Sequence, residues 1–266
     1  MNRLRAYVGG IGVLGPGLPN WDETAAILAG RTAYSPAMTV LPAPALLPSA
    51  ERRRTGRVVK LAIAVAREAA ARAHLDPAGL ASVFSSSGGD GHNCHELCQA
   101  LALEEREISP TRFSNSVHNA AAGYWSIATG AKRESNVLCA FDASFCAGLL
   151  EAITQVVVDG EPLLLVAYDT EYPEPIFTKR PIPDAFGAAL VLTPTQSPAS
   201  LARIEVSLGD DPWHTLAEPA LESLRQSIPA ARSLPLLRQL ALRQSGRAVL
   251  EYLDVARVRV QVESCA

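Results

Sequence analysis

Residues 135–160 read SNVLCAFDASFCAGLLEAITQVVVDG, and this stretch decides the fold. Its first half, Asn136 to Phe141, is an apolar run typical of a strand. Its second half, Ala143 to Val158, repeats apolar residues at helical spacing and ends before Gly160. Asp142 lies at the joint between them. Such tight joints often present a nucleophile, because the helix N-terminus offers unpaired N–H groups to a developing negative charge.

The composition is that of a packed α/β protein. The 266 residues are 48% hydrophobic, enough for one α/β domain or for a domain with an appendage. A net charge of -3 provides no basic field for nucleic acid, and we see no apolar run long enough to span a bilayer. The five cysteines follow no disulfide pattern. We therefore expect a cytoplasmic protein with no nucleic-acid partner and no membrane span.

Hydrophobic periodicity places strands and helices in alternation along the chain. Residues 34–49 contain four prolines and are predicted to be an irregular surface loop. The glycines within the first strand mark places where the backbone must pass closely or turn. We predict strands over 4–14, 80–87, 162–168, 186–192, 201–208 and 256–262 (the last a terminal edge strand), and helices over 20–28, 51–75, 92–103, 113–131 and 213–226 and from 234.

A metal site in the helix at 92–103 is the first functional possibility to weigh. His95 and Cys98 lie one turn apart on the same face, with His92 and Cys94 beside them. No second pair of ligands follows at a recognised spacing. We therefore predict ordinary helix residues here, and neither a metal nor a cofactor in the protein.

Several segments resemble the opening half of beta-ketoacyl synthases, in the same order and at the same spacing. The resemblance covers roughly residues 4–208. It implies a thiolase-like fold, a layered α/β/α arrangement with a mixed sheet, in which residues 1–208 form the N-terminal domain of a ketosynthase and 209–266 a short α+β appendage packed on it. The segments are RAYVGGIGVLGPGLPNWDETAAILAGRTAY (5–34), AERRRTGRVVKLAIAVAREAA (50–70), SSSGGDG (85–91), SNSVHNAAAGYWSIATGA (114–131), the joint at Asp142, and FGAALVL (186–192).

The chain departs from the synthases at the nucleophile. In that family the joint carries a cysteine that takes the acyl chain as a thioester, whereas here Asp142 stands at this position. An acyl carboxylate would be a hydrolysis-prone mixed anhydride. The plainer interpretation is a helix N-cap, which stabilises a helix by about 0.5–2 kcal/mol. The family's two histidines and glycine-rich loop do not appear after Leu208, where His214 is the only histidine. We expect no condensation activity from this chain alone.

The sequence SVHNAAAGYWSIATG (116–130) is most similar to the short chain-length-factor-type subunits of aryl polyene pigment biosynthesis. That resemblance implies a noncatalytic partner that forms a heterodimer with a full-length ketosynthase in type II fatty acid or polyketide biosynthesis. Such a subunit shapes the acyl tunnel at the shared interface and meets the acyl carrier protein through the complex. The resemblance assigns to the interface and tunnel Phe113, Ser114, Ser116, Val117, His118, Tyr124 and Trp125.

Plainer interpretations stand beside these assignments. Tyr124 and Trp125 have the spacing of core residues, and His118 fits a hydrogen-bonded interface histidine. A second hypothesis is a free-standing acyltransferase or thioesterase that uses Cys146, Ser144 or Asp142, with His118 as the base. A third is a docking protein for acyl carriers, whose contact would be a group of arginines that is otherwise a solvated helix start: Arg52, Arg53, Arg54 and Arg57.

Overall fold

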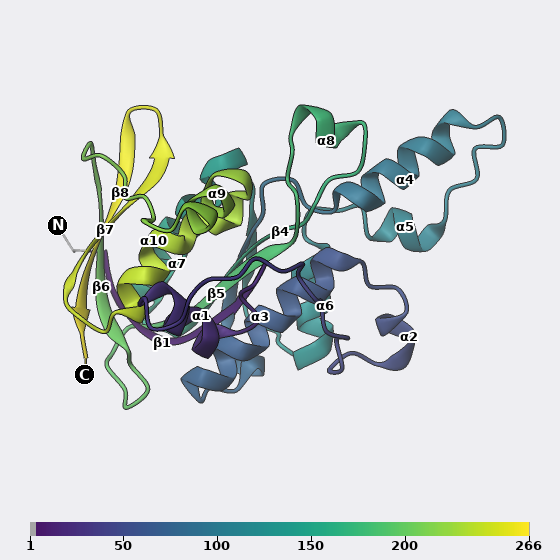
Figure 1. The fold of residues 1–266 in the computed structure, drawn as a ribbon. Coiled ribbons are helices and arrows are strands. Elements are labelled where there is room, and N and C mark those ends of the chain that lie inside the picture. Colours follow the sequence, from purple (N-terminus) through teal and green to yellow (C-terminus); the bar gives the residue numbers. More distant parts are fainter. Residues whose placement is uncertain (1–3, 266) are drawn as a thin grey trace.

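The computed structural model describes residues 4–265, which build one mixed sheet of eight strands covered by helices on both faces (Figure 1). The strand order is β3-β2-β4-β5-β1-β6-β8-β7. Strands β3, β2 and β4 are parallel, and the remaining neighbours pair antiparallel. The strands are β1 (Leu4–Leu14), β2 (Ala81–Ser85), β3 (Ser135–Leu138), β4 (Leu163–Asp169), β5 (Phe186–Thr193), β6 (Ala202–Gly209), β7 (Gly246–Leu253) and β8 (Ala256–Ser264).

The helices form two layers, one on each face of the sheet. Helices α3 and α6 pack on one face, and α1, α7, α9 and α10 belong to the core on the other. This arrangement confirms the predicted α/β/α layering with a mixed sheet. The helices are α1 (Trp21–Leu28), α2 (Ser49–Arg52), α3 (Arg57–Ala73), α4 (Gly91–Ala102), α5 (Pro110–Ser114), α6 (Ala120–Thr129), α7 (Ser144–Asp159), α8 (Ile176–Lys179), α9 (Pro219–Ser227) and α10 (Leu234–Ala241), with 3-10 turns η1 (Pro77–Gly79), η2 (Phe141–Ala143) and η3 (Pro229–Ser233).

Two glycines allow α3 to lie directly on β1. A Cβ atom at Gly12 would lie 2.0 Å from the carbonyl oxygen of Val65, and one at Gly10 would lie 2.1 Å from that of Ala69. Both carbonyls belong to the backbone of α3, so a side chain on the strand has nowhere to go. The close approach that the sequence predicts for the first strand is therefore the contact between β1 and α3.

The C-terminal segment differs most from the predicted elements. The helix predicted at 213–226 begins only at Pro219, and the helix from 234 ends at Ala241. A hairpin of β7 and β8 then follows, in which β8 lies between β6 and β7. The predicted terminal edge strand is therefore an inner strand, and β7 is the edge. Strand β7 was missed because its apolar residues do not alternate cleanly with polar ones.

The helix predicted from Glu51 is also divided, because residues 53–56 form a turn and a short connection between α2 and α3. Gly56 has a reason to be there, since a Cβ atom at this position would lie 2.6 Å from a carboxylate oxygen of Asp90.

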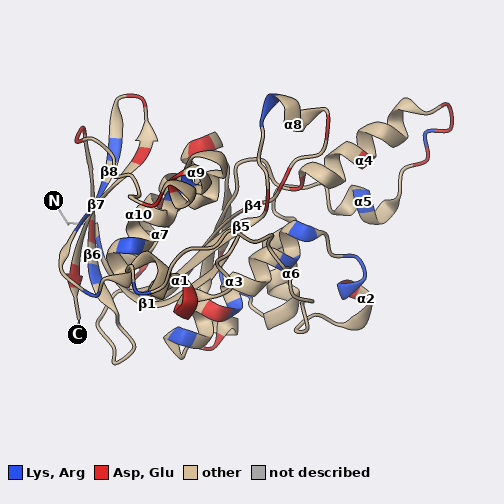
Figure 2. Cartoon of the chain, in the orientation of Figure 1, with Lys and Arg blue, Asp and Glu red and all other residues tan. Residues whose placement is uncertain are grey.

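Two helical features concern the outside of the molecule. Helices α4 and α5 form an arm that projects from the body (Figure 1), and the turn at its tip carries acidic residues (Figure 2). Within residues 4–265, one helix, Phe141–Asp159, is long and apolar enough to cross a membrane by length and composition. Half of its most apolar window is buried inside the protein, where α7 packs against the sheet.

We predict that Gly12→Ala lowers the free energy of unfolding by about 3 kcal/mol, because the new methyl group overlaps the backbone of α3. Urea denaturation measures the change. Gly79→Ala is the matched control, because a Cβ atom at Gly79 has nothing within 4 Å and its cost should stay within about 0.5 kcal/mol. Equal effects of the two substitutions would contradict the close packing of β1 on α3.

Candidate functional site

The candidate site lies at the edge of the sheet where the three parallel strands end. The loops that leave β3, β2 and β4 all begin at this edge, as in other parallel sheets whose sites form there. Strand β3 ends at Leu138, earlier than predicted, and the chain reaches Asp142 through the 3-10 turn η2. Phe141 has a φ of 52°, a left-handed conformation that is costly for a residue with a side chain. The joint is therefore a sharply bent elbow.

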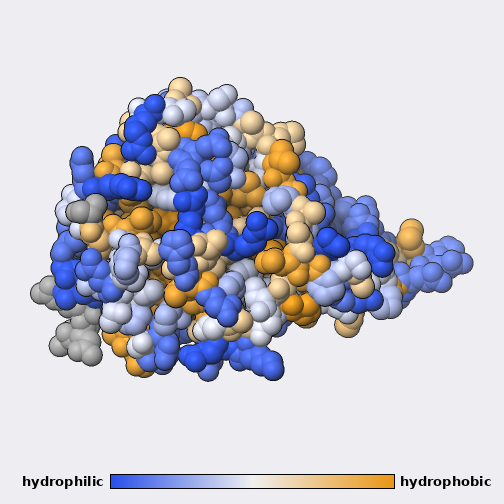
Figure 3. All heavy atoms as spheres, turned by 90° about the horizontal axis from the view of Figure 1, so that it is seen from below, coloured by the Kyte–Doolittle hydropathy of each residue, from blue (hydrophilic) through white to orange (hydrophobic). Residues whose placement is uncertain are grey.

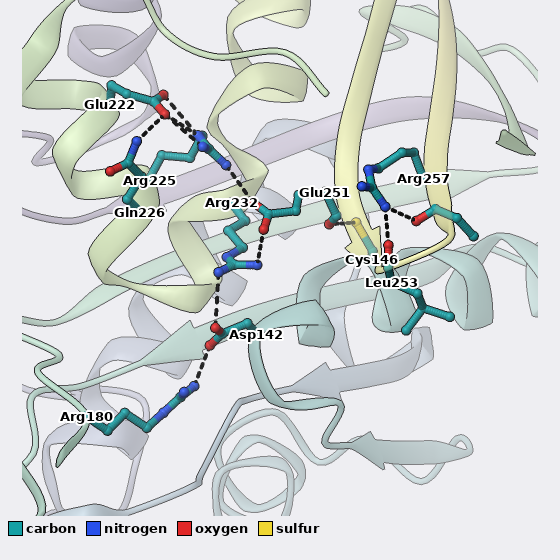
Figure 4. Close-up of polar contacts among 11 residues, drawn as sticks. Asp142, Cys146, Arg180, Glu222, Arg225, Gln226, Arg232, Glu251, Leu253 and Arg257 are labelled. Atoms are coloured by element: carbon teal, nitrogen blue, oxygen red, sulfur yellow. Dashed lines mark hydrogen bonds and ion pairs between the residues drawn. The ribbon is translucent and has the colours of Figure 1, made fainter. Parts of the chain in front are cut away.

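The carboxylate of Asp142 is held between two arginines (Figure 4). The Arg180 guanidinium donates to Oδ1 at 2.7 Å, and that of Arg232 donates to Oδ2 at 3.1 Å. Arg180 also lies over the ring of Phe141, 3.8 Å from its centroid. The predicted N-cap role of Asp142 is wrong, because neither η2 nor α7 has a side-chain cap and the carboxylate faces the two guanidinium groups instead.

The ion pairs continue beyond Asp142 into the C-terminal segment. Arg232 also binds Glu251 at 3.0 Å, and Glu251 binds Arg225 at 3.0 Å. Arg225 in turn forms a two-pronged pair with Glu222, with N···O distances of 2.7 and 2.9 Å. We call this set of three arginines and three acids the elbow relay: Arg180, Asp142, Arg232, Glu251, Arg225 and Glu222 (Figure 4).

The relay is most deeply buried at Arg225, whose side chain is 4% exposed. Hydrogen bonds from Arg225 lower the pKa of Glu222 to about 2. A two-pronged pair of this kind fixes both the direction and the distance of the guanidinium. The relay thus ties η2 to α9, η3 and β7, and its positive and negative charges balance.

The other two nucleophile candidates of the elbow, Cys146 and Ser144, form hydrogen bonds with the surrounding backbone. Cys146 is 1% exposed, its thiol donates to the carbonyl of Glu251 at 3.3 Å, and burial raises its pKa. The Ser144 hydroxyl accepts from the N–H of Ala140 at 3.0 Å and donates to the carbonyl of Phe141 at 2.7 Å. Ser144 thus stabilises the turn, and Cys146 links α7 to β7. None of these hydrogen bonds involves a histidine that could act as a base.

Asp169, a buried acid that we did not predict from the sequence, lies at the same edge of the sheet, where β4 ends. The Oδ1 atom of Asp169 accepts from the N–H and hydroxyl of Ser87, at 2.8 and 2.7 Å, and from Ser86. Its Oδ2 atom accepts from the N–H of Ala230 at 2.9 Å. Burial raises the pKa of Asp169 to about 6. An acid directly after the buried run LLLVAY was the only signal in the sequence.

The predicted interface residues lie at the base of the arm. Phe113 and Val117 are 66% and 53% exposed, and Ser114 and Ser116 are exposed beside them. His118 is half-buried, and its Nε2 atom has no hydrogen-bond partner within residues 4–265.

Tyr124 and Trp125 of the same predicted set are buried, at 8% and 1% exposure, in the core beneath α6. The Tyr124 hydroxyl donates to Asn115 at 3.1 Å. The structure therefore places five of the seven predicted residues on one exposed segment, and the two aromatic residues behind it.

The four arginines predicted as a carrier contact do not form one cluster. Arg57 pairs with Glu171 at 2.5 Å, and Arg54 pairs with Glu51 at 3.3 Å. Arg52 and Arg53 are exposed at the end of α2 and in the turn that follows it. In the part of the chain that the structure describes, no three His, Cys, Asp or Glu side chains are grouped to hold a metal.

Comparison with known proteins identifies the family. The model of the beta-ketoacyl synthase N-terminal domain matches residues 21–248, and the chain belongs to this family. No curated protein matches it. The family and the thiolase-like fold predicted from the sequence motifs are thereby confirmed.

Solved structures with the same fold include two complexes of a ketosynthase with a chain length factor. One contains the ketosynthase ApeO and the chain length factor ApeC from Xenorhabdus doucetiae, with 22% identity, a TM-score of 0.73, and coverage of 96% of this chain and 98% of that one. The ishigamide ketosynthase/chain length factor gives 13% identity, a TM-score of 0.72, and coverage of 98% and 99%. A third structure, AntDE:AntF, is a type II polyketide synthase acyl carrier protein in complex with its ketosynthase. It gives 12% identity, a TM-score of 0.76, and coverage of 99% of this chain and 100% of that one.

We predict that Arg225→Ala lowers the free energy of unfolding by about 3–5 kcal/mol, because it leaves Glu222 and Glu251 without their buried partner. Chemical denaturation measures the loss. Arg203→Ala is the control, because Arg203 pairs with Glu263 at the surface and such pairs contribute at most about 1 kcal/mol. A loss no greater than that of the control would show that the relay contributes little to stability.

The pH dependence of Glu222 gives a second test of the relay. Its pKa is lowered from 4.5 to about 2 in the folded protein, so its contribution to stability is present above pH 4.5 and disappears as the pH falls toward 2. The difference in unfolding free energy between the wild type and Glu222→Gln should therefore be constant from pH 7 to 5 and shrink below it. Denaturation curves at several pH values measure this difference. A gap that is the same at pH 2 as at pH 5 would contradict the lowered pKa.

Proposed function

We propose that the chain is a noncatalytic, chain-length-factor-like partner of an active beta-ketoacyl synthase in type II fatty acid or polyketide biosynthesis, of the aryl polyene kind. The observation that carries the proposal is the state of Asp142, which stands where the family resemblance puts the nucleophile. Its two carboxylate oxygens are bound by Arg180 and Arg232. A carboxylate in two ion pairs is a weak nucleophile, and its acyl product would be a labile anhydride.

The proposed heterodimer forms at the edge strand β3 of the sheet. Strand β3 is the last strand on its side, with β2 as its neighbour in the described sheet, and an open edge strand is a template for pairing with another chain. Exposed apolar side chains gather on the segment that precedes α6 and on α6 itself, where Phe113, Val117 and Ile127 are 66%, 53% and 53% exposed. Exposed apolar groups of this kind are typical of protein interfaces. The ketosynthase covers this region in our proposal.

The same segment supplies the proposed wall of the acyl tunnel. Ser114 and Ser116 lie between the two exposed apolar residues Phe113 and Val117, and His118 follows directly, so this stretch offers both apolar and polar groups to a shared tunnel. Tyr124 and Trp125 support the stretch from the core. The solved complexes that share this fold are described as ketosynthases with chain length factors, which favours the same assignment.

The proposed contact with the acyl carrier protein lies on the exposed turn between α2 and α3. Arg52 and Arg53 have no ion pair with any described residue and are free to meet an acidic carrier. Arg54 lines a pocket of about 430 Å³ together with Ser114, Val117 and other residues of α5 and α6. The carrier site and the tunnel segment are thus neighbours. We further propose that 1–208 act as the ketosynthase-like domain, with 209–266 as an appendage that closes the elbow through the relay.

We expect a one-to-one complex when this chain is co-expressed with a full-length ketosynthase from the same source, and the complex should elongate acyl chains from malonyl and acyl carrier thioesters. Val117→Glu should prevent the complex, because it places a charge in the apolar interface. Val255→Glu is the matched control at an exposed valine of the β7–β8 turn. Size-exclusion chromatography with light scattering measures complex formation.

Asp142→Asn tests the noncatalytic role directly. The complex with this variant should elongate chains at a rate within about twofold of the wild type, because the carboxylate takes part in no bond that forms or breaks. If the isolated chain instead turns over acyl thioesters and Asp142→Asn abolishes that turnover, the chain is a free-standing acyltransferase or thioesterase and our proposal is wrong.

A further inference from the structure

A second hollow lies along the outer face of α3. Its volume is about 1190 Å³, slightly above the range of about 300–1,000 Å³ that is typical of small-molecule sites. One wall is formed by residues 37–46, which we call the strap, and another by Trp21 and its neighbours at the start of α1. Figure 3 shows the underside of the molecule, where apolar residues gather in patches bordered by hydrophilic ones. The outer face of α3 and the strap line this hollow together, and we call it the groove.

The floor of the groove is one face of α3. Lys60, Ile63, Ala64, Arg67 and Ala71 line it at helical spacing, and the opposite face of the helix packs on the sheet. Ile63 is only 3% exposed. Since a helix rises 1.5 Å per residue, Lys60 and Arg67 are separated by about 10 Å along the axis, with an apolar floor between them.

The strap is attached to the body at its beginning and its end. The N–H of Gly17 donates to Ala37 at 2.9 Å, and Thr39 bonds Asp184 and Ala185 at 2.9 and 2.8 Å. Leu47, directly after the strap, is 2% exposed. Between these anchors the strap contributes prolines, alanines and other apolar residues to the groove: Met38, Val40, Pro42, Ala43, Pro44, Ala45 and Leu46.

The charges of the groove are unequal along its length. At the far end, Arg72 is neutralised by Asp22 at 2.8 Å and by Glu68 at 3.1 Å. Lys60 and Arg67, beneath the strap, form no ion pair with any residue that the structure describes. The part of the groove with the apolar floor therefore carries two uncompensated positive charges, and it complements a ligand with an apolar body and an acidic head.

We propose that the groove binds a linear amphipathic anion, a hydrocarbon chain that ends in a carboxylate. The chain lies on Ile63 and Ala64 under the strap, and the carboxylate pairs with Lys60 or Arg67. The lining of this groove includes neither Asp142 of the elbow nor residues 113–118 of the proposed interface, so the site is independent of the proposed pairing with a ketosynthase. The reasoning rests on the shape, the apolar lining and the unmatched cations of the groove.

Isothermal calorimetry with dodecanoate below its micelle concentration tests the proposal on the full chain. We expect saturable one-to-one binding, and Lys60→Glu combined with Arg67→Glu should weaken it by about tenfold or more, the equivalent of one lost charged contact. Each single variant shows which cation holds the head. Ala64→Trp should block the groove, because it places a large side chain on the floor.

Controls separate the groove from general charge and from loss of folding. Arg52→Glu combined with Arg53→Glu makes the same change of net charge outside the groove and should leave binding within about twofold of the wild type. Melting curves verify that each variant is folded. The proposal is overturned if dodecanol binds as tightly as dodecanoate, if the two pairs of charge reversals weaken binding equally, or if no dodecanoate binds to the folded wild type.

Discussion

The structure depends on the pairing of Asp142 with Arg232. This contact joins the elbow, which follows the strand at the open edge of the sheet, to a segment 90 residues later in the chain. Because Arg232 also binds Glu251, the elbow, η3 and β7 are held by one guanidinium group. The position that the family resemblance assigns to a nucleophile is thus part of a structural network.

The relay is a costly way to hold two segments together. Removing charges from water costs several kcal/mol per ion, and apolar residues of the same volume are often as stabilising as a buried ion pair. Ion pairs add geometric specificity, because the two parallel hydrogen bonds between Arg225 and Glu222 form in only one relative orientation of the two side chains. We therefore interpret the relay as a device that fixes where the C-terminal segment sits, within a core that already supplies the apolar burial.

The sequence predicted the features that depend on local pattern. The bounds of β1, the glycine contacts on its surface, the helix α7 and the buried strands β4 and β5 follow from residues that are near each other in the chain. The relay could not be predicted, because Arg180 and Arg232 lie 38 and 90 residues from Asp142 and nothing local marks them as its partners. For the same reason Asp142 was expected to cap a helix, the only partner that its neighbours offered. The hairpin of β7 and β8 was missed because strand pairing, and not a clean alternation of residues, defines it.

The backbone of the elbow is held in a strained conformation at one residue. Phe141 has a left-handed conformation, which costs about 1–2 kcal/mol in a residue with a side chain and persists only where the surroundings enforce it. Here Arg180 holds two consecutive residues of the bend, because it lies over the Phe141 ring and binds the Asp142 carboxylate. The strained turn and the ion pair therefore stabilise each other. The Asp142 carboxylate is neutralised within the chain by Arg180 and Arg232, so the bent elbow is held by the same ion pairs that join it to the C-terminal segment.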